Sequence, residues 1–281
     1  KCYKNVMAGI GARTGARPVI EGNQCYENVL AGIGSQEGSA SIIFNNQCKN
    51  NGQVGIGTQT GARALIVENQ CHNNATAGIG VQEKASAIVL DNKCEENKLV
   101  AIGIRNGSDA YIGRNKLVRT GGMPPMIAVR EDSSVVVADN NIIGGGVAGV
   151  MVQGTAVISG NQFQGNGPRA GGPPNFAAWI QGGSKVSFFN NRTDRWRHAL
   201  FAGDASQIWA TNNTVSNFLG SAIVVNNSKL PAHVFGNVAL SDSENDKAAT
   251  VKGPQGIVGD NARMATEPSA AAENADTPPA R

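Results

Sequence analysis

The chain has 281 residues, a net charge of +3 and only 16% charged residues. This net charge is modest and the sequence has no recognised nucleic-acid-binding motif, so it does not indicate a nucleic-acid partner. Glycine is abundant at 36 residues and aromatic residues are scarce at 5%, which favours a tightly turning β structure over a helical bundle. The longest apolar runs, such as Val135 to Ala138, are far too short to span a membrane.

The first 115 residues contain a strong internal repeat. Residues of one type recur every 23 positions, in four series. The series are Cys2, Cys25, Cys48, Cys71 and Cys94; Asn23, Asn46, Asn69, Asn92 and Asn115; Asn5, Asn28, Asn51, Asn74 and Asn97; and Ile10, Ile33, Ile56, Ile79 and Ile102. One unit reads Ala-Gly-Ile-Gly, a polar turn, a short apolar run such as residues 41–44, and then Asn-x-Cys-x-x-Asn.

A unit of this length holds three short strands and three turns but no useful helix, so one repeat predicts one coil of a parallel helical sheet. After residue 115 the period loosens, yet Asn141, Asn161, Asn191, Asn213, Asn237 and Asn261 still close similar apolar runs. We therefore predict an all-β, single-stranded parallel β-helix of roughly ten coils over residues 1–262. The sequence starts within a repeat, so we expect an N-terminally truncated domain, and the polar residues 263–281 are predicted to be a disordered tail.

The asparagine and cysteine series have a structural interpretation. An inward asparagine can donate its amide to the next coil and form a ladder that satisfies buried turn groups. The cysteine position corresponds in later coils to Leu117, Ile143, Phe163 and Val215, which indicates an inward slot for a small hydrophobic side chain. The chain has no Cys-x-x-Cys pair, so we predict no metal site.

This repeat resembles the right-handed β-helix repeats of the pectin-lyase-like superfamily over residues 1 to about 262. The resemblance implies an extracellular or cell-envelope protein, and the superfamily includes polysaccharide lyases, polygalacturonan hydrolases, mannuronan epimerases, phage tailspikes and non-catalytic repeat proteins. The Asp-Pro-His-Asp motif of the epimerases is absent, as are the paired aspartates and His-Gly of the polygalacturonases. Glu131, Asp132 and Asp204 are the nearest candidates for calcium ligands, and they are scattered.

The Gly-Ile strand predicts an outer face that changes along the molecule. If the isoleucines point inward, the glycines that follow them lie outside in the first five coils. Later coils place Ala128, Met151, Trp179 and Phe201 in that row, beside Arg130, Gln153 and Gln181. Such exposed apolar side chains suit either sugar rings or a covering segment, and both interpretations stay open.

Two Gly/Pro-rich insertions, at residues 119–126 and 165–176, precede this strand, and residues 194–198 add a basic and aromatic edge. Residues 114–200 contain nine Lys or Arg against four Asp or Glu, so an anionic polymer such as a uronate chain would be attracted there. The predicted ligand-binding residues are Trp179, Phe201, Met151, Arg130, Arg169, Trp196, Gln153 and Gln181.

The sequence favours a binding scaffold for carbohydrate over an enzyme, because no convergent acid, base and metal set is recognisable. As an enzyme it would abstract a proton beside a uronate carboxylate, with His198 or Arg197 as the base and Arg130, Arg195 or a metal, such as calcium, as the stabilising cation. A structural or protein-interaction role without a glycan is the third alternative.

A second apolar row supports that third alternative. In the run before each ladder asparagine both alternating sets are apolar: Ile20, Ile43, Ile66 and Val89 in one, and Val19, Ile42, Leu65, Ile88 and Tyr111 in the other. Only one set can face the core. The other predicts an exposed aliphatic stripe for self-association or a flanking domain.

Overall fold

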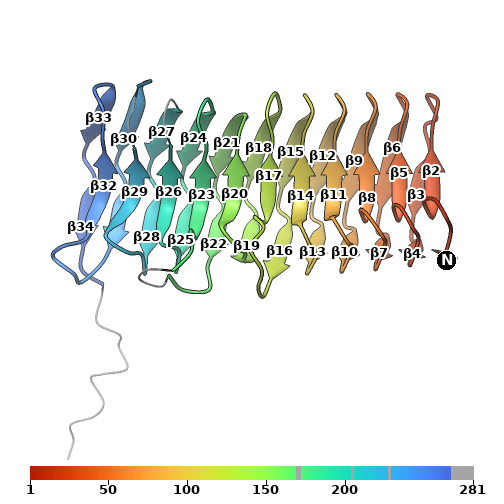
Figure 1. Cartoon of the computed structure of the whole chain (residues 1–281), viewed down its shortest axis with the longest axis horizontal. Helices are drawn as coiled ribbons and strands as arrows, with labels where there is room; N and C mark the ends of the chain where they lie inside the picture. Colours follow the sequence, from red (N-terminus) through yellow and green to blue (C-terminus); the bar gives the residue numbers. More distant parts are fainter. Residues whose placement is uncertain (169–171, 204–205, 227–228, 267–281) are drawn as a thin grey trace, which may run out of the picture.

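The computed structural model describes residues 1–168, 172–203, 206–226 and 229–266, and all of their regular structure is β-strand. The strands form three parallel sheets, here called A, B and C, and the chain visits the sheets in turn. Figure 1 shows the resulting solenoid, in which equivalent strands of successive coils lie side by side along the long axis. Within these residues no helix is long and apolar enough to cross a membrane.

Sheet A has twelve strands, and sheets B and C have eleven each. The strands of sheet A are β1 (Cys2–Tyr3), β4 (Gln24–Tyr26), β7 (Gln47–Lys49), β10 (Gln70–His72), β13 (Lys93–Glu95), β16 (Lys116–Arg119), β19 (Asn141–Gly144), β22 (Gln162–Gln164), β25 (Arg192–Asp194), β28 (Thr214–Ser216), β31 (Val238–Leu240) and β34 (Ala262–Met264). Those of sheet B are β2 (Ile10–Ala12), β5 (Ile33–Ser35), β8 (Ile56–Thr58), β11 (Ala77–Val81), β14 (Val100–Ile104), β17 (Ile127–Val129), β20 (Ala148–Val152), β23 (Phe176–Ile180), β26 (His198–Ala202), β29 (Ser221–Val225) and β32 (Lys247–Val251). Those of sheet C are β3 (Val19–Glu21), β6 (Ala40–Phe44), β9 (Arg63–Val67), β12 (Ser86–Leu90), β15 (Asp109–Gly113), β18 (Ser134–Ala138), β21 (Thr155–Ser159), β24 (Lys185–Phe189), β27 (Gln207–Thr211), β30 (Ala232–Phe235) and β33 (Gly256–Gly259).

The predicted all-β parallel solenoid is confirmed. The strand registers pair residues one repeat apart, as in Ile79 with Ile56 and Cys71 with Cys48. The strands continue to Met264, two residues past the predicted end of the domain. Most of the predicted tail, residues 267–281, lies outside the described residues.

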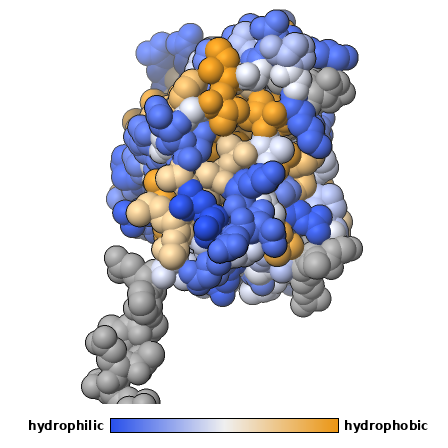
Figure 2. Space-filling view, turned by 90° about the vertical axis from the view of Figure 1, so that its left-hand side faces the viewer, coloured by the Kyte–Doolittle hydropathy of each residue, from blue (hydrophilic) through white to orange (hydrophobic). Residues whose placement is uncertain are grey.

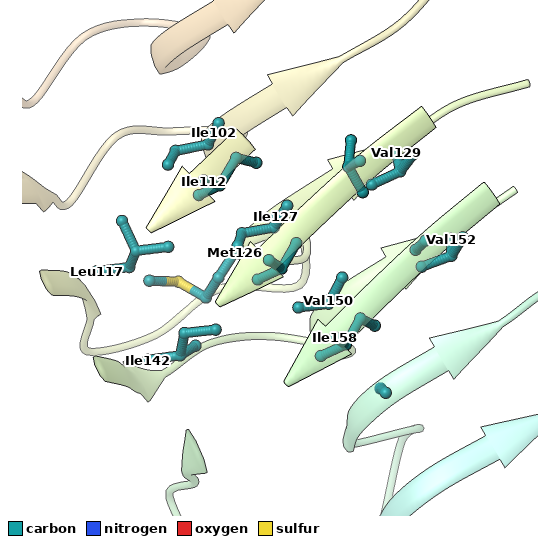
Figure 3. Packing of buried hydrophobic residues seen from close by; sticks show 14 of the residues in the cluster. Ile102, Ile112, Leu117, Met126, Ile127, Val129, Ile142, Val150, Val152 and Ile158 are labelled. Atoms are coloured by element: carbon teal, nitrogen blue, oxygen red, sulfur yellow. The ribbon is translucent and has the colours of Figure 1, made fainter. Parts of the chain in front are cut away.

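The core is a stack of inward rows from all three sheets. Figure 3 shows Ile102, Ile127 and Val150 from sheet B facing Leu117 and Ile142 from sheet A. Burying such side chains contributes about 1.5–3 kcal/mol each. At the C-terminal end of the solenoid, which faces the viewer in Figure 2, hydrophobic residues lie among hydrophilic ones, and Ile257 and Val258 of β33 are about half exposed.

Both asparagine ladders are present. In the first ladder, Asn69 Nδ2 donates to Asn92 Oδ1 at 3.0 Å and to the carbonyls of Ile43 and Val67 at 2.9 Å. The ladder continues through every coil to Asn261, but its member in the sixth coil is Asn140. Asn141, the residue that we predicted, is exposed in β19. That coil spans 25 residues instead of 23, so the 23-residue period does not decide which of the two adjacent asparagines points inward.

The second ladder ends at a buried arginine. Asn5, Asn28, Asn51, Asn74 and Asn97 bond in sequence. In the next coil, Arg119 donates to the carbonyl oxygens of Asn97 at 2.6 Å, Leu99 at 3.0 Å and Pro124 at 2.7 Å. Burial lowers the pKa of this guanidinium below its ordinary value. Arg119 therefore closes the ladder where the first insertion begins.

The cysteines occupy the predicted inward slot. Cys25, Cys48, Cys71 and Cys94 are fully buried and unbridged. Hydrogen bonds with the thiols of Cys48 and Cys94, followed by burial, raise the pKa of Cys71 well above its ordinary value. The register continues the column through Leu117, Ile142, Phe163, Thr193 and Val215. Our assignment of Ile143 to this column was wrong by one residue, for the same reason as Asn141.

Candidate functional site

The outer face of sheet B carries a row of small residues that turns into a row of large ones. The glycines take the outer position of their strands as predicted, but only Gly11 is exposed, Gly34 is buried, and Gly57, Gly80 and Gly103 are half-buried. The row continues in register from Gly103 through Ala128, Met151 and Trp179 to Phe201. The row therefore runs along one face of the solenoid from a glycine floor to an aromatic region. The middle of the row differs from our expectation, because Met151 is buried, 6% exposed, in a small cluster with Ala128 and Ala148.

A cleft of about 450 Å³ lies over the glycine part of this row. Gly57, Gly80 and Gly103 form its floor. One wall of the cleft is formed by apolar residues that precede the glycines in each coil, namely Val54, Leu99 and Val100. The other wall is formed by polar residues that follow the glycines, namely Gln59, Gln82, Arg105 and Arg130. Glycine at the floor lets a ligand approach the backbone closely.

The polar side of the cleft is a hydrogen-bonded row of side chains. Gln82 Nε2 donates to Gln59 Oε1 at 2.6 Å, and Arg105 Nε donates to Gln82 Oε1 at 2.7 Å. In the next coil Arg130 Nη1 donates to Gln153 Oε1 at 2.8 Å, and Gln153 donates in turn to Gln181. The two arginines thus sit in adjacent coils, and their hydrogen bonds to the row run in opposite directions along the solenoid.

Arg105 and Arg130 are exposed, and neither forms an ion pair with an acidic residue of the described chain. A guanidinium carries five N–H donors, and the row uses one from each. Two like charges one coil apart repel each other, so an anion bound between them would be favourable. The pair is therefore suited to a carboxylate.

An aromatic cluster lies on the same face, two and three coils beyond Arg130. The ring of Phe176 stacks on Phe201 with centroids 4.6 Å apart and on His198 with centroids 5.4 Å apart, and Trp179 meets its edge at 5.9 Å. Trp179 and Phe201 are half-buried. Part of their surface is thus used in packing among themselves, and part faces solvent.

His198 is held in one orientation within this cluster. Its Nδ1 lies 2.6 Å from the carbonyl oxygen of Ser221, so Nδ1 carries the proton and donates it. Burial, together with the positive charge of Arg197, lowers the pKa of His198 below its ordinary value. The ring is therefore neutral at pH 7, and Nε2 keeps its lone pair.

The other residues of the predicted basic edge are dispersed. Arg195 is exposed in a turn and pairs with Asp194, with Nε 3.2 Å from Oδ2. Arg197 is half-buried, and its backbone N–H donates to the carbonyl of Asn175 at 2.9 Å. Arg169 and Asp204 lie outside the described residues. The prediction that Trp196 binds the ligand was wrong, because its side chain is 1% exposed within the core and does not lie on the face of sheet B.

The described residues of both insertions occupy one corner of the solenoid, as predicted, between a strand of sheet A and the next strand of sheet B. They contact each other, since Asn166 Nδ2 donates to the carbonyl of Thr120. Within the described residues, no three His, Cys, Asp or Glu side chains gather in a way that could hold a metal ion. Glu131 and Asp132 are exposed in the turn after Arg130.

Sequence reasoning missed the glutamine side of the cleft. Gln36, Gln59 and Gln82 recur every 23 residues, and Arg105 follows at the same interval. This repeat could have identified the polar wall of the cleft, but a row of polar residues beside a turn usually indicates only a solvated surface.

The family model described as "Right handed beta helix region" matches residues 1–117 and 124–255. No curated protein matches the sequence. Among solved structures, the chain is similar to the alginate lyase from Paenibacillus sp. str. FPU-7, with a TM-score of 0.60 and 12% identity over 80% of this chain and 88% of that one. It also matches a tailspike protein of E. coli bacteriophage HK620 in complex with a pentasaccharide, with a TM-score of 0.43 and 10% identity over 92% of this chain and 56% of that one.

Proposed function

This chain belongs to the right-handed β-helix family, and on that premise we propose that it is a binding scaffold for an acidic polysaccharide, taken up along the outer face of sheet B. The observation that carries the proposal is the pair Arg105 and Arg130, two exposed guanidiniums in adjacent coils beside a glycine-floored cleft. Uronate carboxylates match them in charge and in their planar, two-oxygen shape.

The shape of the face suits an extended polymer better than a small ligand. Equivalent side chains repeat at about 4.8 Å along the solenoid. A polymer lying along the axis meets the glycine floor first, then Gln153, and then the exposed parts of Trp179 and Phe201. The aromatic faces favour the C–H groups of sugar rings.

Binding measurements on the full chain test the proposal. Calorimetry or affinity electrophoresis would compare polygalacturonate and alginate with a neutral glycan such as dextran. We expect the two uronate polymers to bind, more weakly as salt increases, and dextran not to bind. Equal behaviour of all three polymers would contradict the proposal.

Two variants and their controls locate the contact. The double variant Arg105→Gln/Arg130→Gln is expected to weaken uronate binding at least about tenfold, which corresponds to about 1.4 kcal/mol. Lys116→Gln/Arg192→Gln removes the same charge from the outer face of sheet A and serves as the control.

A second pair tests the cleft by shape alone. Gly80→Leu would fill the cleft, because a Cβ at Gly80 meets only an ordinary contact with Val54 at 3.5 Å, and it is expected to abolish binding. Gly11→Leu, in the same row but outside the cleft and with open space around it, is expected to bind normally.

The aromatic part of the face has its own test. Trp179→Ala and Phe201→Ala each remove a half-buried ring in line with the cleft. Weaker binding of the uronate polymers by these variants would include the aromatic region in the binding face. Unchanged affinity for every glycan would show that these rings only pack against their neighbours and do not contact the ligand.

A polysaccharide lyase is the second candidate function, and His198 is the observation that favours it. Its neutral ring, with Nδ1–H donated to Ser221, presents Nε2 as an acceptor that could remove the proton beside a uronate carboxylate. Arg197 would supply a positive charge near the developing anion.

Incubation with pectate and alginate, with and without calcium, while following ultraviolet absorbance of unsaturated products, tests this candidate. A lyase gives a rise that His198→Gln abolishes. If the absorbance does not rise with any polymer under either condition, the lyase function is rejected. The binding-scaffold proposal is then decided by the binding measurements alone.

A further inference from the structure

The outer face of sheet C carries a continuous apolar row that nothing in the described residues covers. Its central row runs through Val19, Ile42, Leu65, Ile88, Tyr111, Val136 and Val157. The exposed fractions are 65% for Val19, 44% for Ile42, 48% for Ile88 and 39% for Tyr111. A shallow groove of about 870 Å³ follows this row over six coils.

A soluble protein rarely leaves so continuous an apolar stripe in contact with water, so a stripe of this kind marks an interaction surface. The stripe was predicted from the alternation of apolar residues, but the sequence did not identify its partner. The charged residues that flank the stripe in the structure indicate what that partner is.

Two opposite charges lie symmetrically about β12 at the rim of the groove. In the row beside the stripe, Ser86 of β12 pairs in register with Arg63 on one side and with Asp109 on the other. Both charged residues are exposed and line the groove. They are two coils apart, about 10 Å, which is too far for a direct ion pair within one chain, and they form none.

A two-fold axis along β12 turns this arrangement into a complementary pair of surfaces. Rotation about a line parallel to the strand keeps each residue in its row and reverses the order of the coils. Arg63 of one copy then faces Asp109 of the second copy, and the same contact occurs twice. Ile88 faces its own equivalent on the axis.

The apolar rows satisfy the same symmetry. In the central row Leu65 faces Tyr111 of the second copy and Ile42 faces Val136. In the row on the other side of the stripe, Phe44 faces Ala138, so a large side chain meets a small one. Charge and volume therefore match about one axis.

We propose that two copies of this chain associate in antiparallel orientation through the outer faces of their C sheets, about a two-fold axis along β12. This interface leaves the cleft of sheet B accessible in both copies, and it does not depend on the function proposed for that cleft. A head-to-tail or parallel pairing would place Arg63 opposite a different row member and would lose both ion pairs.

Charge reversal and its rescue test the interface. Sedimentation velocity of the full chain over a range of concentrations is expected to show a dimer. Asp109→Arg should raise the dimer dissociation constant at least about tenfold, whereas the double reversal Arg63→Asp/Asp109→Arg should restore it, because each ion pair is re-formed with its signs exchanged. Glu244→Arg, an exposed acidic residue outside the groove, is the control and should dimerise normally.

Crosslinking tests the orientation. Ile88→Cys lies on the axis and should form an intermolecular disulfide with itself on mild oxidation. Ile42→Cys should not crosslink alone but should crosslink when mixed with Val136→Cys. A monomer at every concentration, equal effects of the single and double charge reversals, or self-crosslinking of Ile42→Cys would each overturn the proposal.

Discussion

A single side-chain amide fixes the course of the chain at each corner between sheets C and A. Asn140 donates to the carbonyls of Ile112 at 2.9 Å and Ala138 at 3.0 Å, and its Oδ1 accepts from Asn115. The residue before each ladder asparagine has a left-handed backbone, as at Asp139 with φ 57°. The ladder holds a conformation that most side chains avoid.

Asn140 and Asn141 therefore provide a matched pair of substitutions. Asn140→Ala leaves several buried donors and acceptors without partners and is expected to lower the free energy of unfolding by about 3 kcal/mol or more. Asn141→Ala removes an exposed side chain and should change it by less than about 0.5 kcal/mol. Denaturant unfolding followed by circular dichroism measures both, and equal effects would contradict the ladder assignment.

His198 makes stability depend on pH. Burial lowers its pKa in the folded state below the ordinary value of 6.5, so acid favours the unfolded state, which binds the proton more readily. The contribution of the neutral ring is complete above pH 6.5 and is lost as the pH falls towards the lower folded-state pKa. His198→Phe keeps a ring against Phe176 but cannot titrate.

We expect wild type to lose more unfolding free energy than His198→Phe between pH 7.5 and pH 5. Unfolding curves at both values measure this difference, and other titrating groups such as His72 cancel in the comparison. Identical pH dependence in the two proteins would show that the folded state does not disfavour the charged ring.

At the scale of the strand, glycine is required where the second asparagine ladder passes beneath sheet B. A Cβ at Gly55 would lie 2.6 Å from the carbonyl oxygen of Gly78 and 2.9 Å from Asn74 Nδ2. The equivalent residue becomes Ala101 in the coil whose Asn97 is the last member of that ladder. The second ladder and the row of glycines that contains Gly55 and Gly78 thus end in the same coil.

Gly55→Ala is expected to destabilise the fold by about 1–3 kcal/mol through overpacking. Gly11→Ala, at the outer position of β2 with open space around it, is the control and should have little effect. Thermal unfolding distinguishes the two, and a neutral Gly55→Ala would mean that the coils can separate at this point.

Sequence reasoning at this scale was accurate where the period is constant and less so where it changes. The strands, both ladders and the outward glycine row follow from a strict 23-residue step. After Asn115 the ladder steps are 25, 21 and 30 residues, so alternation no longer fixes which neighbour points inward. Trp196 shows the same limit, because an aromatic residue in a polar turn motif gave no signal that it enters the core.

At the scale of the whole molecule, each coil contacts only its neighbours, so stability is local and lowest at the ends. The last strand, β34, is exposed along its entire length, whereas the central strand β18 has three buried residues. Hydrogen exchange is expected to be fastest in β34 and slowest in central coils, with a gradient between them. Uniform protection along the chain, measured by mass spectrometry of proteolytic fragments, would instead indicate one all-or-none unfolding unit.

The uneven coil lengths have a consequence for how such proteins diversify. Residues 120–126, and residues 165–168 with 172–175, extend the corner between sheets A and B, while the first asparagine ladder passes uninterrupted through the corner between sheets C and A. Loops of new length and composition can therefore be grafted at the first corner without altering the register of the stack. Variation in loop length is thus separated from the corner that the first ladder fixes, so surface loops can change on an unchanged frame.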